Sequence, residues 1–339
     1  MQSVIIFFII NLFFCLWNPT YKNTQARVVY WTCCVSAILL IGLRGNIDND
    51  YATYVDMFSS DHILVEPTFL IIRFLVRDII GGGIAGLMLI YAAISVTIRF
   101  IAIKRYSPFI FLSVIIWIGN LMILQDMTQI RAAVASSIML LATGAHYERK
   151  PVPYFSLTLI ATMFHVSALL MIPLWLFTSK KINKWLWTGI IATGYILALK
   201  GIYLTSLLSL LPFEYIQTKL LTYSIETTDD GGANILGLFQ ITRIGLFMLL
   251  LWNAQRIQSH NRYTILLLKI MACGLVALPL FRNNIVLGLR ITELLTSVDI
   301  LLYPMVIYLF PIRSIGKFII ICYSAAIMYG RLFLEGLLK

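Results

Sequence analysis

Apolar runs long enough to cross a membrane recur along the whole chain, and this feature restricts its fold most. The runs between charged residues predict helices at 3–17, 28–43, 82–103, 109–124, 130–146, 185–200, 235–254, 263–280, 292–311 and 317–335. Because 60% of the residues are hydrophobic and only 12% are charged, the chain has too little polar surface for a water-soluble globule. We therefore expect an all-α, polytopic integral membrane protein with about 10–12 transmembrane helices of ~20 residues each. Residues 1–339 are expected to form a single membrane domain.

The apolar segment 153–178 differs from the other runs because it contains His165 and Pro173. It is long for one membrane-spanning helix and short for two. We predict a pair of short helices or a broken hairpin, with His165 at the break.

The charged residues between the runs predict the orientation, since cytoplasmic connections are enriched in lysine and arginine. The expected helices put the basic residues on one side, taken as the cytoplasm: Lys22, Arg27, Lys104, Arg105, Arg149, Lys150, Lys180, Lys181, Lys184, Arg256, Arg262, Arg313 and Lys317. The outer side holds the acidic residues Asp48, Asp50, Asp56, Asp61, Glu66, Asp126, Glu214, Glu226, Asp229 and Asp230. It also holds two long polar loops, 44–66 and 212–234. To preserve this sorting, Pro67–Ile80 must lie along the outer interface instead of crossing the membrane.

Several ionisable residues are expected at the depth of the outer leaflet, where each is a site hypothesis because charge there is costly. They are Arg44, Arg131, His165, Arg282 and Arg290. Taken singly, each arginine could extend its charge to lipid phosphates, and His165 could be a hydrogen-bonded core residue. Four arginines on the side without the basic excess indicate a shared function instead.

Guanidinium groups bind phosphate oxygens in a bidentate manner, and an imidazole or a carboxylate can accept a proton from an attacking hydroxyl. Together these groups indicate group transfer from a lipid-linked diphosphate. Glu293 and Asp299 add carboxylates near Arg290, although neutralisation of charge inside the bundle explains them equally well.

Other classes of protein leave no signal in the sequence. The net charge of +11 comes from small scattered groups without a basic face, so no nucleic-acid partner is expected. The five cysteines lie within apolar stretches and predict no metal cluster. No phosphate-binding glycine loop, zinc-protease motif or serine nucleophile motif occurs, and we expect no cofactor.

Four blocks of residues, in order over about residues 40–305, form one further pattern in the sequence. The first outer loop carries Arg44, Asp50, Tyr54 and Glu66-Pro67-x-Phe69. Three further blocks are Thr128-Gln129-Ile130-Arg131-Ala132-Ala133-Val134-Ala135, Phe164-His165-x-Ser167-Ala168-Leu169, and Arg290 followed by Pro304. Together the four blocks resemble the EpsG-like family of bacterial polysaccharide polymerases, a branch of the Wzy O-antigen polymerase group. The second block departs from the family pattern, because Ala132 stands where a glutamine usually follows the arginine.

This resemblance implies a fold similar to the GT-C glycosyltransferases and a glycosyltransferase activity. The enzyme would polymerise undecaprenyl-pyrophosphate-linked repeat units, as donor and acceptor, at the periplasmic face of the bacterial inner membrane. The implied transfer is inverting and independent of metal. Arg131 and Arg290 would stabilise the leaving pyrophosphate, and His165, or failing it Asp50 or Glu66, would deprotonate the acceptor hydroxyl. The residues expected to bind substrate are Arg44, Asp50, Tyr54, Glu66, Arg282 and Glu293.

Other functions stay open at this point. A polysaccharide ligase is the nearest alternative, followed by a membrane O-acyltransferase, which would also use a histidine. A flippase or transporter for the same lipid would need charges at mid-membrane depth. The expected partners are the lipid bilayer and, for a polymerase, a regulator of chain length.

Overall fold

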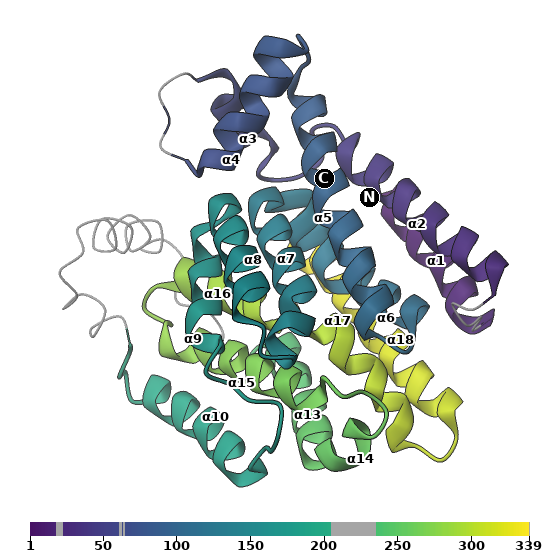
Figure 1. Ribbon diagram of the computed structural model, residues 1–339, viewed down its shortest axis with the longest axis vertical. Coiled ribbons are helices and arrows are strands. Elements are labelled where there is room, and N and C mark those ends of the chain that lie inside the picture. Colours follow the sequence, from purple (N-terminus) through teal and green to yellow (C-terminus); the bar gives the residue numbers. More distant parts are fainter. Residues whose placement is uncertain (18–22, 61–62, 64, 205–234, 339) are drawn as a thin grey trace. The chain divides into compact units, whose positions relative to one another are not determined.

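The computed structural model describes residues 1–17, 23–60, 63, 65–204 and 235–338 (Figure 1). In these residues the ordered elements are helices, and one isolated β-bridge joins Asp48 to Leu338. The prediction of an all-α fold is confirmed. The chain divides into two compact units, Met1–Pro173 with Ile300–Lys339, and Leu174–Asp299. The predicted outer loop 212–234 lies outside the described residues.

The helices have the length and composition of a multi-pass membrane protein. Four are long and apolar enough to cross a membrane: α2 (Thr24–Gly42), α5 (Ile84–Tyr106), α6 with the π-helix η2 (Ile110–Thr128), and α18 with η5 (Arg313–Leu334). Shorter apolar helices are α1 (Gln2–Trp17), α8 (Pro151–Phe164), α10 (Lys184–Leu199), α13 (Leu238–Trp252) and α15 (Thr264–Leu280). The polytopic membrane fold is therefore confirmed, and the similarity to GT-C enzymes stays a prediction.

The first unit is built around a buried apolar helix. Residues Ile110–Thr128 are buried along their whole length, because α1 packs on α6, and α18 packs on both α6 and η2. Gly119 permits the contact with α18: a Cβ atom there would lie 2.4 Å from the Ser324 carbonyl oxygen. Helices α2, α5, α7 (Ile130–Tyr147) and α8 form a row in the same unit, in which each helix packs against the next (Figure 1).

Along the chain, two short helices follow α2 and precede α5. They are α3 (Tyr51–Ser59), within the predicted outer loop 44–66, and α4 (Pro67–Phe74), which continues as the π-helix η1 (Leu75–Ile79). Pro67 occupies the first turn of α4, where its missing N–H costs no hydrogen bond. Gly81 then adopts a positive φ of 70°, which separates this helix from α5. The stretch Pro67–Ile80, for which the sequence predicts a position along the outer interface, is helical through Ile79. Its position along the interface stays a prediction.

The second unit is organised around α15. This helix packs against α10, α13, α14 (Ala254–Gln258) and α16 (Ile285–Thr296), and most of its side chains are buried. Gly274 allows close approach to α16, since a Cβ atom there would lie 2.8 Å from Thr296 Cγ2.

The break predicted in segment 153–178 is confirmed. Helix α8 ends at Phe164, and His165 has an extended backbone with φ −157° and ψ 127°. A 3₁₀-helix, η3 (Val166–Leu170), and the short α9 (Met171–Leu174) follow. His165 therefore stands between two short helical segments.

The prediction of one continuous helix at 292–311 is wrong. Helix α16 ends at Thr296, and the chain continues as α17 (Asp299–Leu302) and the 3₁₀-helix η4 (Tyr303–Leu309). The hydroxyls of Thr296 and Ser297 donate to backbone carbonyls at 2.7 Å, an interaction that competes with regular helix formation. Pro304 lacks the N–H that a continuous α-helix needs.

The first unit has two ends, which carry different charged connections, and which end faces the cytoplasm stays a prediction. Tertiary contacts join the end of α2, the start of α5, the start of α7 and the end of α8 at one end of the unit. Lys104 and Arg105 end α5, and Arg149 and Lys150 lie between α7 and α8, so these basic residues lie at the opposite end. The assignment of Asp126 to an outer connection is wrong, because this residue is buried within η2.

Candidate functional site

An ion pair between Arg131 and Glu66 is the centre of the candidate site. Glu66 immediately precedes α4, and Arg131 is the second residue of α7. Arg131 Nη1 donates to Glu66 Oε2, although the two residues are 65 positions apart in the sequence. Their side chains are 23% and 17% exposed. The pair is therefore sheltered but still accessible to a ligand.

Aromatic side chains form one wall of this site. The guanidinium of Arg131 lies 5.9 Å from the centroid of the Phe69 ring, in cation–π range. Tyr54 stacks on Phe69 with centroids 6.4 Å apart, and Tyr54 is also a hydrogen-bond partner of Arg131. The ring centroid of Tyr91 lies 6.3 Å from that of Phe69. A cation beside stacked rings is an arrangement that can hold both a phosphate and a sugar face.

His165 lies in the same neighbourhood through its flanking residues. Phe164 packs edge-on against Tyr91 at 6.1 Å, and Tyr91 lies within electrostatic range of Arg131 and Glu66. Thr68 also donates to the backbone carbonyl of Met163 at 2.7 Å, which ties α4 to the end of α8. The structure thus brings the blocks containing Glu66, Arg131 and His165 together at one end of the first unit.

The His165 side chain caps the short helix that follows it. Its Nδ1 accepts the Ser167 backbone N–H at 3.2 Å and lies 2.8 Å from Ser167 Oγ. Because a backbone N–H can only donate, Nδ1 must be the unprotonated nitrogen of the neutral ring. The ring proton is therefore on Nε2.

The Arg44 guanidinium is bound by neighbouring groups of the chain, namely Asp48, Ile41 and Met88. Arg44 Nε lies 2.8 Å from Asp48 Oδ2, and both side chains are almost completely buried. Arg44 Nη1 donates to the Ile41 carbonyl at 2.9 Å, and Nη2 lies 3.5 Å from Met88 Sδ in α5. These contacts fix the beginning of the segment 44–66, the predicted outer loop, to α5. Asp50 precedes α3, and its carbonyl accepts the Tyr54 N–H at 3.1 Å.

Arg282, Arg290 and Glu293 belong to the second unit. Arg282 lies in the turn after α15, and Arg290 lies in α16 one turn before Glu293. Arg290 Nη1 is 3.9 Å from Glu293 Oε2, with side-chain exposures of 29% and 9%. The carboxylate and the arginine that the sequence placed near each other do form a pair.

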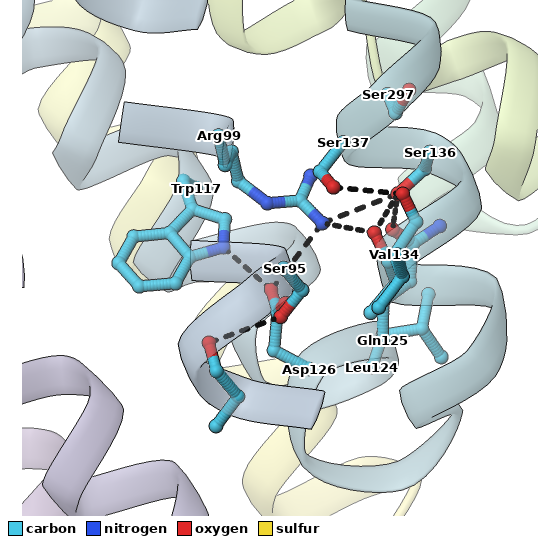
Figure 2. Close-up of polar contacts among 12 residues, drawn as sticks. Ser95, Arg99, Trp117, Leu124, Gln125, Asp126, Val134, Ser136, Ser137 and Ser297 are labelled. Carbon is cyan, nitrogen blue, oxygen red and sulfur yellow. Dashed lines mark hydrogen bonds and ion pairs between the residues drawn. The ribbon is translucent and has the colours of Figure 1, made fainter. Parts of the chain in front are cut away.

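A buried polar network in the first unit was not predicted from the sequence (Figure 2). Arg99 in α5 and Asp126 in η2 are fully buried, and Arg99 Nη2 lies 3.5 Å from Asp126 Oδ2. Trp117 Nε1 donates to the same carboxylate oxygen at 2.7 Å. A lone arginine within a long apolar run was the signal that could have identified this network.

The same network reaches the first turns of α7. Arg99 Nη2 donates to the Ala133 carbonyl and to Ser136 Oγ, both at 3.2 Å. Ser136 in turn donates to Gln125 Oε1 at 2.6 Å (Figure 2). Because Ala133 and Ser136 follow Arg131 closely in α7, the network holds the helix that carries Arg131.

Within the part of the chain that the structure describes, no group of three or more His, Cys, Asp or Glu side chains could hold a metal ion. The described side chains at the candidate site are arginine, carboxylate, imidazole and aromatic groups.

The fold and the site define a polytopic helical membrane protein with an arginine–carboxylate site at one end of its first unit. A family model for the EpsG family matches residues 27–335, nearly the whole chain. The chain belongs to the EpsG family, a Wzy-like polysaccharide polymerase family, and this confirms the resemblance seen in the sequence. Its role is of the polysaccharide polymerase type. Neither the curated proteins nor the solved structures contain a match to this chain.

Proposed function

We propose that the protein is a membrane glycosyltransferase that polymerises undecaprenyl-pyrophosphate-linked oligosaccharide repeats at the periplasmic face of the bacterial inner membrane. The observation that carries this proposal is the accessible Arg131–Glu66 pair beside the Tyr54 and Phe69 rings. The arginine matches a lipid-linked pyrophosphate, and the rings match the sugar attached to it.

The reaction transfers the growing glycan from its pyrophosphate to the hydroxyl of another lipid-linked repeat. The acceptor oxygen forms a bond to the anomeric carbon of the donor, and the bond from that carbon to the phosphate oxygen breaks. Undecaprenyl pyrophosphate leaves with the electron pair. Negative charge increases on the leaving group, and Arg131 stabilises it there.

Glu66 is better placed than His165 to accept the proton of the acceptor hydroxyl. The Nδ1 atom of His165 accepts the Ser167 N–H, so the ring proton is on Nε2. In this tautomer Nε2 can donate a hydrogen bond but cannot accept a proton. Glu66, by contrast, accepts only from Arg131 in the contacts that define the site. When the donor pyrophosphate engages Arg131, the carboxylate is released and can accept the proton of the attacking hydroxyl. His165 then orders η3 and donates from Nε2 to the substrate.

The other predicted residues keep supporting roles in this proposal. Tyr54 positions the sugar, Asp50 begins the helix that carries Tyr54, and Arg44 holds the loop through Asp48. Arg282, Arg290 and Glu293 stay proposed substrate-binding residues, and Arg290 and Glu293 form their own pair in the second unit.

A flippase is less consistent with the contacts of the buried charges. Two charged residues, Arg99 and Asp126, do lie within long apolar helices. Both side chains are fully buried, however, and Asp126 is bonded to Trp117. Transport would require polar groups that line a path open to substrate.

The decisive experiment measures glycan length in cells that produce variants of this protein at equal membrane abundance. Glu66→Gln keeps a hydrogen-bond acceptor for Arg131 but cannot take a proton, so we expect single-repeat products and a rate loss of ~10² to 10⁴. Arg131→Lys removes the bidentate contact and is expected to have a similar effect.

Arg77 and Asp78 provide the matched control, because they form an exposed pair at 3.1 Å in η1. Arg77→Lys and Asp78→Asn should leave long chains. Normal polymer from both site variants would refute the proposal. Long polymer that remains on its carrier lipid would instead indicate a ligase.

A further inference from the structure

The second unit contains a cleft of about 710 Å³ that the proposed reaction does not use. Its lining comes from the start of α10 and the segment before it, from the junction of α13 and α14, and from Lys269 of α15. Its lining includes the lysines Lys181, Lys184 and Lys269 and the tryptophans Trp185, Trp187 and Trp252. The cleft is therefore both cationic and aromatic.

The cations of this cleft have no anionic partner in the described part of the chain. None of the described residues that line the cleft is acidic, and none of the three lysines forms an ion pair with a described carboxylate. Lys269 is buried, and its Nζ donates one hydrogen bond to the Thr178 carbonyl at 2.6 Å. An ammonium group has three donors, so two remain for a ligand.

The cleft combines tryptophan and lysine side chains, as is typical of helix ends at a membrane–water interface. Lys184 Nζ lies 4.5 Å from the Trp252 ring centroid, and Trp185 packs edge-on against Trp252 at 4.8 Å. Tryptophan and lysine are enriched where helices leave the hydrocarbon core. Leu176 and Leu186, also in the lining, are 76% and 57% exposed, which leaves apolar surface beside the cations.

From these contacts we infer that the cleft binds the headgroup of an anionic phospholipid. Its phosphate lies between Lys184 and Lys269, and its acyl chains lie along Leu176 and Leu186. The basic connections predict that this end of the second unit faces the cytoplasm. Basic pockets between transmembrane helices on that side bind anionic headgroups, and the cytoplasmic leaflet supplies such lipids.

The test measures lipid binding to the purified full-length protein in vesicles. Brominated phosphatidylglycerol or brominated phosphatidylcholine replaces part of the lipid, and quenching of tryptophan fluorescence reports binding near Trp185 and Trp252. We expect phosphatidylglycerol to bind more tightly than phosphatidylcholine. Each lysine changed to glutamine should weaken phosphatidylglycerol binding about fivefold.

The variants are chosen so that folding does not decide the result. Lys181→Gln and Lys184→Gln change exposed residues, and Lys269→Gln is added only after the double variant has been measured. Lys104→Gln with Arg105→Gln, at the end of α5 in the other unit, is the matched control. Trp252→Phe should remove a large part of the quenching and so locate the signal.

Three results would overturn the inference. The first is equal quenching by the two lipids in the unmodified protein. The second is unchanged phosphatidylglycerol binding in the Lys181→Gln, Lys184→Gln double variant, or an equal loss in the control. The third is full displacement of phosphatidylglycerol by inorganic phosphate at millimolar concentration, which would identify a site for free phosphate.

Discussion

Removing one member of the buried Arg99–Asp126 pair is expected to destabilise the protein far more than removing both. Arg99 Nη2 lies 3.5 Å from Asp126 Oδ2, and neither side chain is exposed. At that distance an effective dielectric constant of about 20 gives an attraction of about 5 kcal/mol. Removing one partner of a buried pair costs about 3–5 kcal/mol, because the other charge stays buried without its partner.

The variants are Arg99→Met, Asp126→Asn and the double variant. Asparagine retains an oxygen that can accept the Trp117 N–H, so the change mainly removes charge. We expect each single variant to lose about 3–5 kcal/mol and the double variant to lose about 1–2 kcal/mol. The implied coupling between the two sites is several kcal/mol.

The assay is reversible unfolding of the purified protein in mixed micelles with increasing SDS, followed by tryptophan fluorescence. The four proteins of the cycle give the coupling energy directly. The exposed Arg77–Asp78 pair, changed in the same way, should show a coupling of about 0–1 kcal/mol. If the losses at Arg99 and Asp126 simply add, with a coupling below about 0.5 kcal/mol, the reasoning is refuted.

Three further predictions concern the site, the packing and the topology. His165→Asn keeps an oxygen that can cap η3 but removes the imidazole, so we expect shorter polymer at normal membrane abundance; long chains would limit His165 to its capping role. Gly119→Ala puts a Cβ atom 2.4 Å from the Ser324 carbonyl oxygen and should cost about 1–3 kcal/mol in the same SDS assay, whereas Gly189→Ala, at an open position, should cost little. Reporter fusions after Lys104, Lys150, Lys184 and Arg262 should report the cytoplasm, and fusions within 50–61 should report the periplasm; the opposite result for 50–61 would contradict the proposed face of the site.

The features that were predicted from the sequence depend on local composition. Apolar runs of membrane-spanning length predicted most helices to within a few residues, because each helix must satisfy its own backbone hydrogen bonds in lipid. The break at His165 was predicted because a run of unusual length contained a polar residue and a proline. The Arg44–Asp48 pair was within reach of the same reasoning, since its members are four residues apart.

The features that were not predicted depend on contacts between distant segments. Glu66 and Arg131 are 65 residues apart, and only the packing of α4 near the start of α7 brings them together. Asp126 was assigned to a connection because a carboxylate near the end of an apolar run normally marks the end of a helix. In the structure η2 continues through it as a π-helix, an unusual form over eleven residues, and Arg99 from α5 compensates its charge.

Helix α7 connects the buried network to the proposed site. Arg131 lies in its first turn, and the contacts of Ala133 and Ser136 with Arg99 lie within the next turn and a half. A regular helix moves as a unit over that distance, so the network anchors the part of α7 from which the Arg131 side chain extends toward Glu66 and Phe69. Stabilisation of a leaving pyrophosphate requires a donor held in advance in the right place, and a shift of about 1 Å can cost ~10² in rate. A charge pair inside an apolar unit is costly to insert into a membrane. The position of this pair beside the first turns of α7 is explained if the pair keeps Arg131 in place for its proposed role.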